Sequence, residues 1–145
     1  MQSEAPFIAS SLRGFNAPQS LVVVGGYAYV GDGGQIVTVD ITNPLAPKRL
    51  SAVSGGGYLG GENGMVVSGK YLYIADFGGE LSMWDISNQA LPVFAGGTAD
   101  LGSLIGLAVS GRYAYVGNGN TDSLQIIDIS NPAALSVVGT AQPGG

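Results

Sequence analysis

Short apolar runs separated by glycine and polar residues recur along the whole chain. The runs are rich in Val, Ile and Tyr, whereas Gly, Asp and Asn stand between them. Runs of this length and composition, bounded by turn-forming residues, are typical of β-strands rather than helices. The pattern therefore predicts an all-β protein.

The same apolar pattern occurs three times. Two signatures carry the repeat: a pair of tyrosines in Gly26–Gly31, Lys70–Ala75 and Arg112–Gly117, and an aspartate in Val39–Pro44, Trp84–Gln89 and Ile127–Pro132. Tyr27, Tyr71 and Tyr113 lie 44 and 42 residues apart. Four strands within a period near this length are the pattern of a β-propeller blade.

Each repeat divides into four strands, which we name a to d in chain order. In the third repeat the expected strands are Leu107–Ser110, Tyr113–Gly117, Leu124–Ile129 and Leu135–Thr140. Strand c is apolar on both sides, as expected of a strand that lies between two neighbouring blades. We expect one repeat domain over residues 1–145, with four-stranded antiparallel blades at 21–54, 65–99 and 107–141.

Residues 1–20 form a lead-in loop and an additional strand of the d type. Pro6–Ser10 aligns with Pro92–Gly96, so the chain holds four d strands for three sets of a, b and c. Two arrangements are open at this point. Either the N-terminal strand closes a blade in place of residues 134–140, or one of the two strands frays.

Three blades are too few for a closed ring, because propellers have typically 4 to 8 blades. An open stack would expose an apolar blade face at each end, and such faces are interaction sites or aggregation liabilities. We expect a homodimer that completes a six-bladed ring, in preference to a trimer of nine blades. The alternative is an engineered or excised half of a longer propeller that has no biological ligand.

Two longer motifs carry a family resemblance. Val67–Asp76 (VSGKYLYIAD) and Leu124–Pro132 (LQIIDISNP) resemble the LVIVD repeat, a propeller-blade family of largely uncharacterised bacterial and archaeal proteins. The similarity covers about residues 6–140. It implies a blade fold but no particular activity, since folds do not determine functions. Many members are exported, so the resemblance also implies an extracellular or cell-surface location.

Composition removes several classes of function. The chain has no Cys and no His, which excludes thiol catalysis, Ser-His pairs and zinc sites that need imidazole. A net charge of −5 argues against nucleic acid as a partner. No apolar run approaches the length of a membrane span, and the N-terminus carries no signal-peptide pattern.

Acidic residues gather on one predicted face of the disc, where the b–c and d–a loops meet. The residues that depart from the repeat also fall there, and we take this face as the candidate ligand-binding site, formed by Tyr58, Glu62, Asn63, Asp76, Phe77, Glu80, Asp100, Asn118 and Asp122. Such a face could bind a cation, a basic partner or the basic face of another ring, which would build a filament. The alternative is that these loops are polar only for solubility.

Two groups of polar residues have a specific expected role. Asp40, Asp85 and Asp128 recur once per blade and are expected to accept backbone N–H bonds in the c–d turn. The segment Asn118–Asp122 has alternating oxygen ligands like the start of a calcium loop, but it lacks the glycine and the distal glutamate of that motif. We expect no catalytic residue, no cofactor and no metal site, with Ca²⁺ at Asn118–Asp122 as the alternative.

Three functions follow from these observations. The preferred one is a non-enzymatic, self-assembling propeller that acts as a scaffold or binding module through ring closure and its acidic disc face. The second is a lectin-like module that binds glycan or protein, with Tyr58 or Phe77 as a stacking platform. The third is a carboxylate-pair glycosidase or lyase, because Asp and Glu are the acid–base residues available in number.

Overall fold

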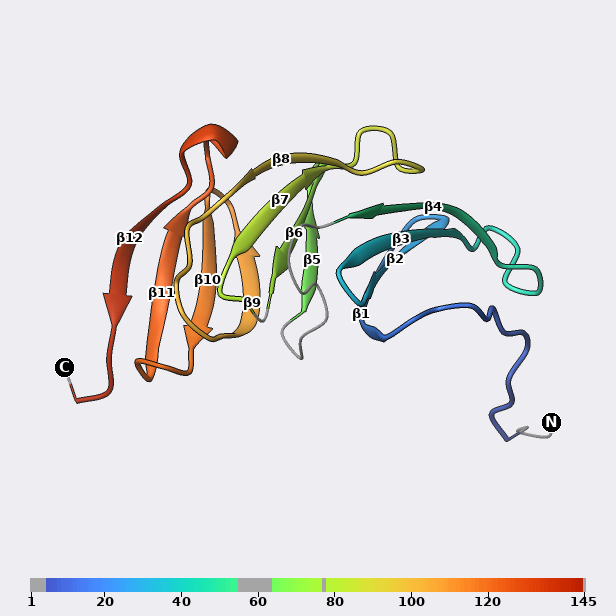
Figure 1. The fold of residues 1–145 in the computed structure, drawn as a ribbon, viewed down its shortest axis with the longest axis horizontal. Coiled ribbons are helices and arrows are strands. Elements are labelled where there is room, and N and C mark those ends of the chain that lie inside the picture. Colours follow the sequence, from blue (N-terminus) through green and yellow to red (C-terminus); the bar gives the residue numbers. More distant parts are fainter. Residues whose placement is uncertain (1–4, 55–63, 77, 145) are drawn as a thin grey trace.

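The computed structural model describes residues 5–54, 64–76 and 78–144 and shows an all-β chain of three antiparallel sheets (Figure 1). The first blade consists of β1 (Pro18–Val24), β2 (Tyr27–Asp32), β3 (Gln35–Asp40) and β4 (Lys48–Ser54). The second consists of β5 (Met65–Ser68), β6 (Tyr71–Ala75), β7 (Leu81–Asp85) and β8 (Val93–Gly97). The third consists of β9 (Leu104–Ser110), β10 (Tyr113–Asn118), β11 (Ser123–Asp128) and β12 (Ser136–Ala141), with a 3-10 turn at Pro132–Ala134.

Each blade is a meander, because the four strands pair in the order in which they follow one another along the chain. The turn between the first two strands of each blade starts with Gly25, Gly69 or Gly111, whose φ angles are 56°, 59° and 60°. This left-handed conformation favours glycine in a two-residue hairpin turn. The first two strands of each blade are therefore joined by a tight turn.

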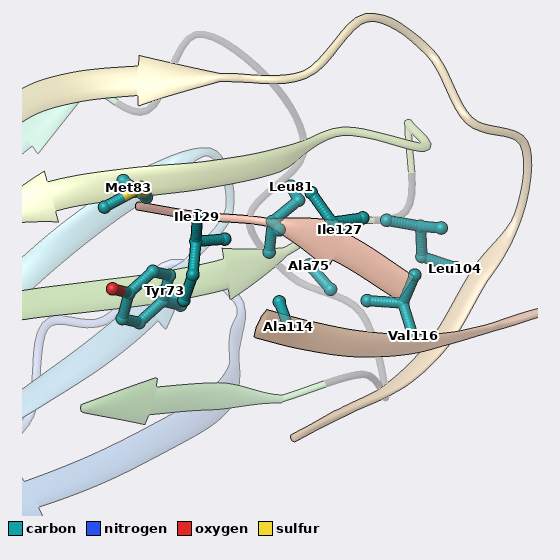
Figure 2. Packing of buried hydrophobic residues seen from close by; sticks show 9 residues of the cluster. All are labelled: Tyr73, Ala75, Leu81, Met83, Leu104, Ala114, Val116, Ile127 and Ile129. Carbon is teal, nitrogen blue, oxygen red and sulfur yellow. The ribbon is translucent and has the colours of Figure 1, made fainter. Parts of the chain in front are cut away.

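The blades stack through two unlike faces. One face carries the tyrosine pair and is called the tyrosine face; in the second blade it presents Tyr73, Ala75, Leu81 and Met83. The other is called the leading face; in the third blade it presents Ala114, Val116, Ile127 and Ile129. Figure 2 shows these two sets of side chains directed toward one another between the blades.

The junction between the first and second blades repeats this arrangement. Tyr29 and Ile36 from the tyrosine face of the first blade form one buried cluster with Leu72, Ile74 and Trp84 from the leading face of the second. Removal of this much apolar surface from water is the main stabilising contribution to the stack. The fold is therefore a row of blades in which each tyrosine face covers the leading face of the next blade.

Strand boundaries differ from the sequence expectations at a few places. The first strand of the third blade starts at Leu104, three residues before the expected position, and the first blade starts at Pro18 rather than at residue 21. Residues 5–15 form no strand, so the d-type strand expected at Pro6–Ser10 does not pair within the single chain. β12 supplies the outer strand of the third blade instead, paired with β11.

A close contact recurs where the outer strand of one blade meets the turn after the third strand of the next. The hydroxyl of Ser51 in β4 donates to the carbonyl of Ala90 at 2.7 Å. In β8, the equivalent residue is Gly96, which lies so close to the Pro132 carbonyl that a Cβ atom would overlap it. Before the first blade, the hydroxyl of Ser10 donates to the carbonyl of Pro44.

The close approach at Gly96 leads to a prediction about stability. We expect Gly96→Ala to lower the free energy of unfolding by about 1–3 kcal/mol, because a backbone carbonyl cannot move aside as a flexible side chain can. Gly139 in β12 is the matched control, since a Cβ there meets only Ile126 side-chain atoms at 3.5 Å or more. Urea unfolding of the two variants should show Gly139→Ala near wild type; equal losses would contradict this account of the junction.

Candidate functional site

Five of the nine predicted face residues lie in the described part of the chain. Tyr58, Glu62, Asn63 and Phe77 lie outside the described residues. The other five are Asp76, Glu80, Asp100, Asn118 and Asp122, all in or beside the loops at one end of the second and third blades. Two of these five residues are buried and three are exposed, and the two groups have different roles.

Asp76 and Asn118 are buried at the end of the second strand of their blades, with exposed fractions of 3% and 2%. Asp76 accepts the Glu80 amide N–H at 2.9 Å. The Asn118 side chain donates to the Leu101 carbonyl and accepts the Asn120 amide N–H at 2.9 Å. The polar atoms of both side chains bond to the backbone of these loops, so few of them remain to bind a ligand.

Asp32 is the matching residue of the first blade, and the sequence reasoning did not select it as a site residue. It is also buried, and its carboxylate accepts the amide N–H groups of Asn16, at 2.8 Å, and Ala17, at 2.5 Å. The carboxylate thus fastens the lead-in chain to the blade that follows. Its position at the end of the second strand, shared with Asp76 and Asn118, is the sequence signal that could have revealed this role.

In the part of the chain that the structure describes, Glu80, Asp100 and Asp122 are the exposed acidic residues of this loop face. The chain segment of Asp100 lies against the turn of Glu80, because the Leu101 amide donates to the Gly79 carbonyl at 2.8 Å. Asp122 lies in the next blade and has a φ of 48°. Among the described residues, no three or more acidic side chains are grouped so that they could hold a metal ion.

The recurring aspartates bond within the turn after the third strand. Asp40 and Asp128 each accept the amide and hydroxyl of the residue two positions on, Thr42 and Ser130, at 2.9 and 2.6 Å. Asp85 accepts the Ser87 amide at 2.8 Å. Hydrogen bonds from Ser130, with a further contribution from Arg112, lower the pKa of Asp128 from 3.8 to about 2. Hydrogen bonds from Thr42 and Ser87 lower the pKa of Asp40 and Asp85 in the same way.

The tyrosine face of the third blade has no blade against it in the chain. Leu124 there corresponds to Leu81 of the second blade, yet Leu124 is 43% exposed and Leu81 is 0% exposed. Ile105, on the same face, is 54% exposed. Tyr113, Tyr115 and Ile126 complete this open surface, and all three are only partly buried.

The leading face of the first blade is the second open surface. Leu21 and Val23 are 61% and 55% exposed, whereas Met65, which corresponds to Leu21, is 7% exposed in the second blade. Leu12 and Phe15 of the lead-in chain cover part of this face and pack on Val37 and Val39.

A hollow of about 320 Å³ remains at this second surface. It is lined by Pro18, Gln19, Ser20, Leu21 and Val30. In the third blade the residues corresponding to Pro18 and Val30 are Leu104 and Val116, which pack in one cluster with Leu81 of the second blade. The hollow therefore lies where the repeat places a leucine from a preceding blade.

Comparison with known proteins agrees with this architecture. The family model of the LVIVD repeat matches residues 17–54, 60–100 and 102–142. The chain belongs to the LVIVD repeat family. A search of curated proteins finds no match to this LVIVD chain.

Solved structures share the propeller fold at low sequence identity. A functionally unknown protein from Desulfotomaculum acetoxidans DSM 771 matches with a TM-score of 0.72 and 18% identity over 85% of this chain and 42% of its own. The periplasmic gluconolactonase of Pseudomonas aeruginosa gives 0.71 and 17%, covering 86% and 39%. BamB from Moraxella catarrhalis gives 0.65 and 14%, covering 88% and 36%. The LVIVD chain thus spans less than half the length of these neighbours.

These similarities are similarities of fold. Among the described residues we find no helix with the length and apolar character that crossing a bilayer requires.

The low pKa of Asp128 leads to a prediction about pH. Because the carboxylate is favoured in the folded state, its stabilising contribution is complete above about pH 4 and is lost as the pH falls toward about 2. In Asp128→Asn the amide oxygen still accepts from Ser130 but has no charge to titrate. We therefore expect wild type to lose more stability than Asp128→Asn between these pH values in thermal unfolding.

Arg112→Gln is the control for this measurement. It removes the ion pair, whose N–O distance is 2.5 Å, but keeps both hydrogen bonds from Ser130, which are the larger cause of the low pKa. This variant should keep most of the wild-type pH dependence. If Asp128→Asn and wild type lose stability in parallel, the turn carboxylate does not contribute in this way.

Proposed function

We propose that this LVIVD chain is a non-enzymatic, self-assembling half-propeller whose two open blade faces bind those of a second copy. The observation that carries the proposal is that these faces are the two unlike halves of the junction already present twice within the chain. The tyrosine face of the third blade would cover the leading face of the first blade of its partner. Two such junctions related by a twofold axis close a ring of six blades.

The residues at each open face match their buried counterparts in the chain. Leu124 and Ile126 stand where Leu81 and Met83 fill the junction between the second and third blades. In the proposed dimer, Leu124 enters the hollow beside Leu21 and Val30 of the partner. Burial of these exposed apolar side chains is the driving force for association.

Ring closure also creates the surface through which the assembly would act. The loops between the second and third strands reach one end of the stack, and the segment from β8 to β9 lies against one of them. Two copies therefore bring their exposed acidic groups, including Glu80, Asp100 and Asp122, to one face of the disc. A face of this charge favours a basic protein partner or stacking on the opposite face of another ring. The glycan-binding alternative takes Tyr58 or Phe77 as its stacking platform, and both lie outside the described residues, as does Glu62.

The experiment that tests the proposal is the mass in solution, measured by light scattering coupled to size exclusion. We expect twice the mass of one chain for wild type. Leu124→Glu should give the mass of one chain and raise the dissociation constant at least about 100-fold, because a carboxylate would be buried at each junction.

Leu91→Glu is the matched control. Leu91 is 46% exposed, close to the 43% of Leu124, but it lies in the middle blade, away from both open faces. This variant should remain dimeric, and both variants should unfold as cooperatively as wild type. A monomeric wild type would overturn the proposal, as would equal dissociation of the two variants.

A further inference from the structure

The segment Pro6–Ser10 presents apolar side chains to solvent with nothing covering them. Phe7 is 77% exposed and Ile8 is 85% exposed. The segment aligns with Pro92–Gly96, and in both cases 21 residues separate the proline from the first tyrosine of the following blade, Tyr27 or Tyr113. Pro92–Gly96 contains most of β8, the outer strand of the blade that precedes Tyr113.

The position of the segment also corresponds to that of an outer strand. Ser10 donates to the Pro44 carbonyl in the turn after the third strand of the first blade. In the two complete junctions, β4 contacts Ala90 and β8 contacts Pro132 in the corresponding turns of the second and third blades. The contact at Pro44 is therefore the contact that the outer strand of a preceding blade would make.

The lead-in chain after Ser10 is held against the first blade by further bonds. Asp32 accepts the amides of Asn16 and Ala17, and the Arg49 guanidinium donates to the Gly14 carbonyl at 2.7 Å. The same guanidinium lies 4.9 Å from the centre of the Phe15 ring. These contacts fix the position of the chain directly after the segment, so its strand can pair only with a blade that precedes the first blade in the ring.

We propose that Pro6–Ser10 is the outer strand of the third blade of a second copy, paired with β11 of that copy in place of β12. The inference rests on the proposed head-to-tail dimer, in which the third blade of one copy precedes the first blade of the other. It adds strand exchange to the contact between faces. Each copy thereby donates one strand and receives one.

The repeat predicts the register of this pairing. In the second blade, Trp84 pairs with Phe94, Met83 with Gly96 and Ser82 with Gly97. The corresponding pairs in the exchanged blade are Ile127 with Ile8, Ile126 with Ser10 and Gln125 with Ser11. In the single chain, the same strand pairs Gln125 with Thr140 and Ile126 with Gly139 of β12, so the two strands compete for one position.

β12 is mostly exposed in the single chain, as are the outer strands β4 and β8 of the other blades. Five of the six residues of β12 are exposed, including Val137 and Val138 at 40% and 55%. The incoming strand places Ile8 where Phe94 of β8 packs on Trp84 with ring centres 5.3 Å apart. It is also anchored next to the junction through Ser10 and Asp32, whereas β12 follows the turn at Pro132–Ala134 of its own blade.

Engineered disulfides distinguish the two strands, because the full chain contains no cysteine of its own. Residues that face one another across paired strands come within the Cα separation that a disulfide needs. We expect Ser11→Cys/Gln125→Cys, oxidised at dimer-forming concentration, to run mostly as a covalent dimer on a non-reducing denaturing gel. Thr140→Cys/Gln125→Cys should form its intrachain disulfide in only a minor fraction of chains.

Two controls accompany the pair. Ser11→Cys alone reports disulfides formed by random collision and should stay monomeric on the same gel. Adding Leu124→Glu to the Ser11→Cys/Gln125→Cys variant should abolish the covalent dimer, because the faces no longer hold the two copies together.

The outcomes separate the two proposals. Strand exchange is overturned if wild type is a dimer by light scattering, Thr140→Cys/Gln125→Cys forms its disulfide within each chain and Ser11→Cys/Gln125→Cys stays reduced. This result leaves the head-to-tail dimer in place. A monomer by light scattering with no covalent dimer overturns both. A covalent dimer from Ser11→Cys/Gln125→Cys that disappears with Leu124→Glu supports both.

Discussion

The packing of a tyrosine face on a leading face is the interaction on which the rest of this structure depends. A four-stranded meander of this size has two apolar sides and cannot bury either by itself. Stacking buries one side of each neighbour, so residues such as Leu81 and Ile127 are completely covered only where two blades meet. Stability in such a row is approximately a sum over blades and junctions, and each end of the row leaves one face open.

Buried polar side chains complement this apolar packing at one end of the blades. Asp32, Asp76 and Asn118 lie at the same point of their repeats and bind loop backbone, which would otherwise leave amides or carbonyls unpaired in a partly buried place. At the other end, aspartates such as Asp128 close the turn after the third strand. The carboxylates of Asp32, Asp76, Asp40, Asp85 and Asp128 therefore have structural roles. Glu80, Asp100 and Asp122 are exposed instead.

The same geometry connects architecture to function. Closure of a ring of blades completes both end faces of the disc. The row of three blades has two unlike open faces, and Ser10 of the lead-in chain contacts the Pro44 carbonyl of the first blade. In the proposed dimer, assembly and completion of the disc face are one event, driven by apolar burial rather than by charge.

The sequence by itself determined the repeat, the strands, their turns and the family. These features are local: alternation of apolar side chains, a glycine at each tight turn and an aspartate two residues before its amide donor are all visible within a few residues. The alignment of Pro6–Ser10 with an outer strand was equally visible.

Only the tertiary structure decided which of these residues are buried and which are exposed. Leu81 and Leu124 occupy the same place in their repeats, and nothing local distinguishes them; their exposure differs because one blade has a neighbour and the other has none. Likewise Asp32 resembles a loop carboxylate in sequence, but its amide partners come from a segment about 15 residues away that folds back on it. Contacts between distant segments depend on how blades stack, and a pattern of neighbouring residues does not contain that information.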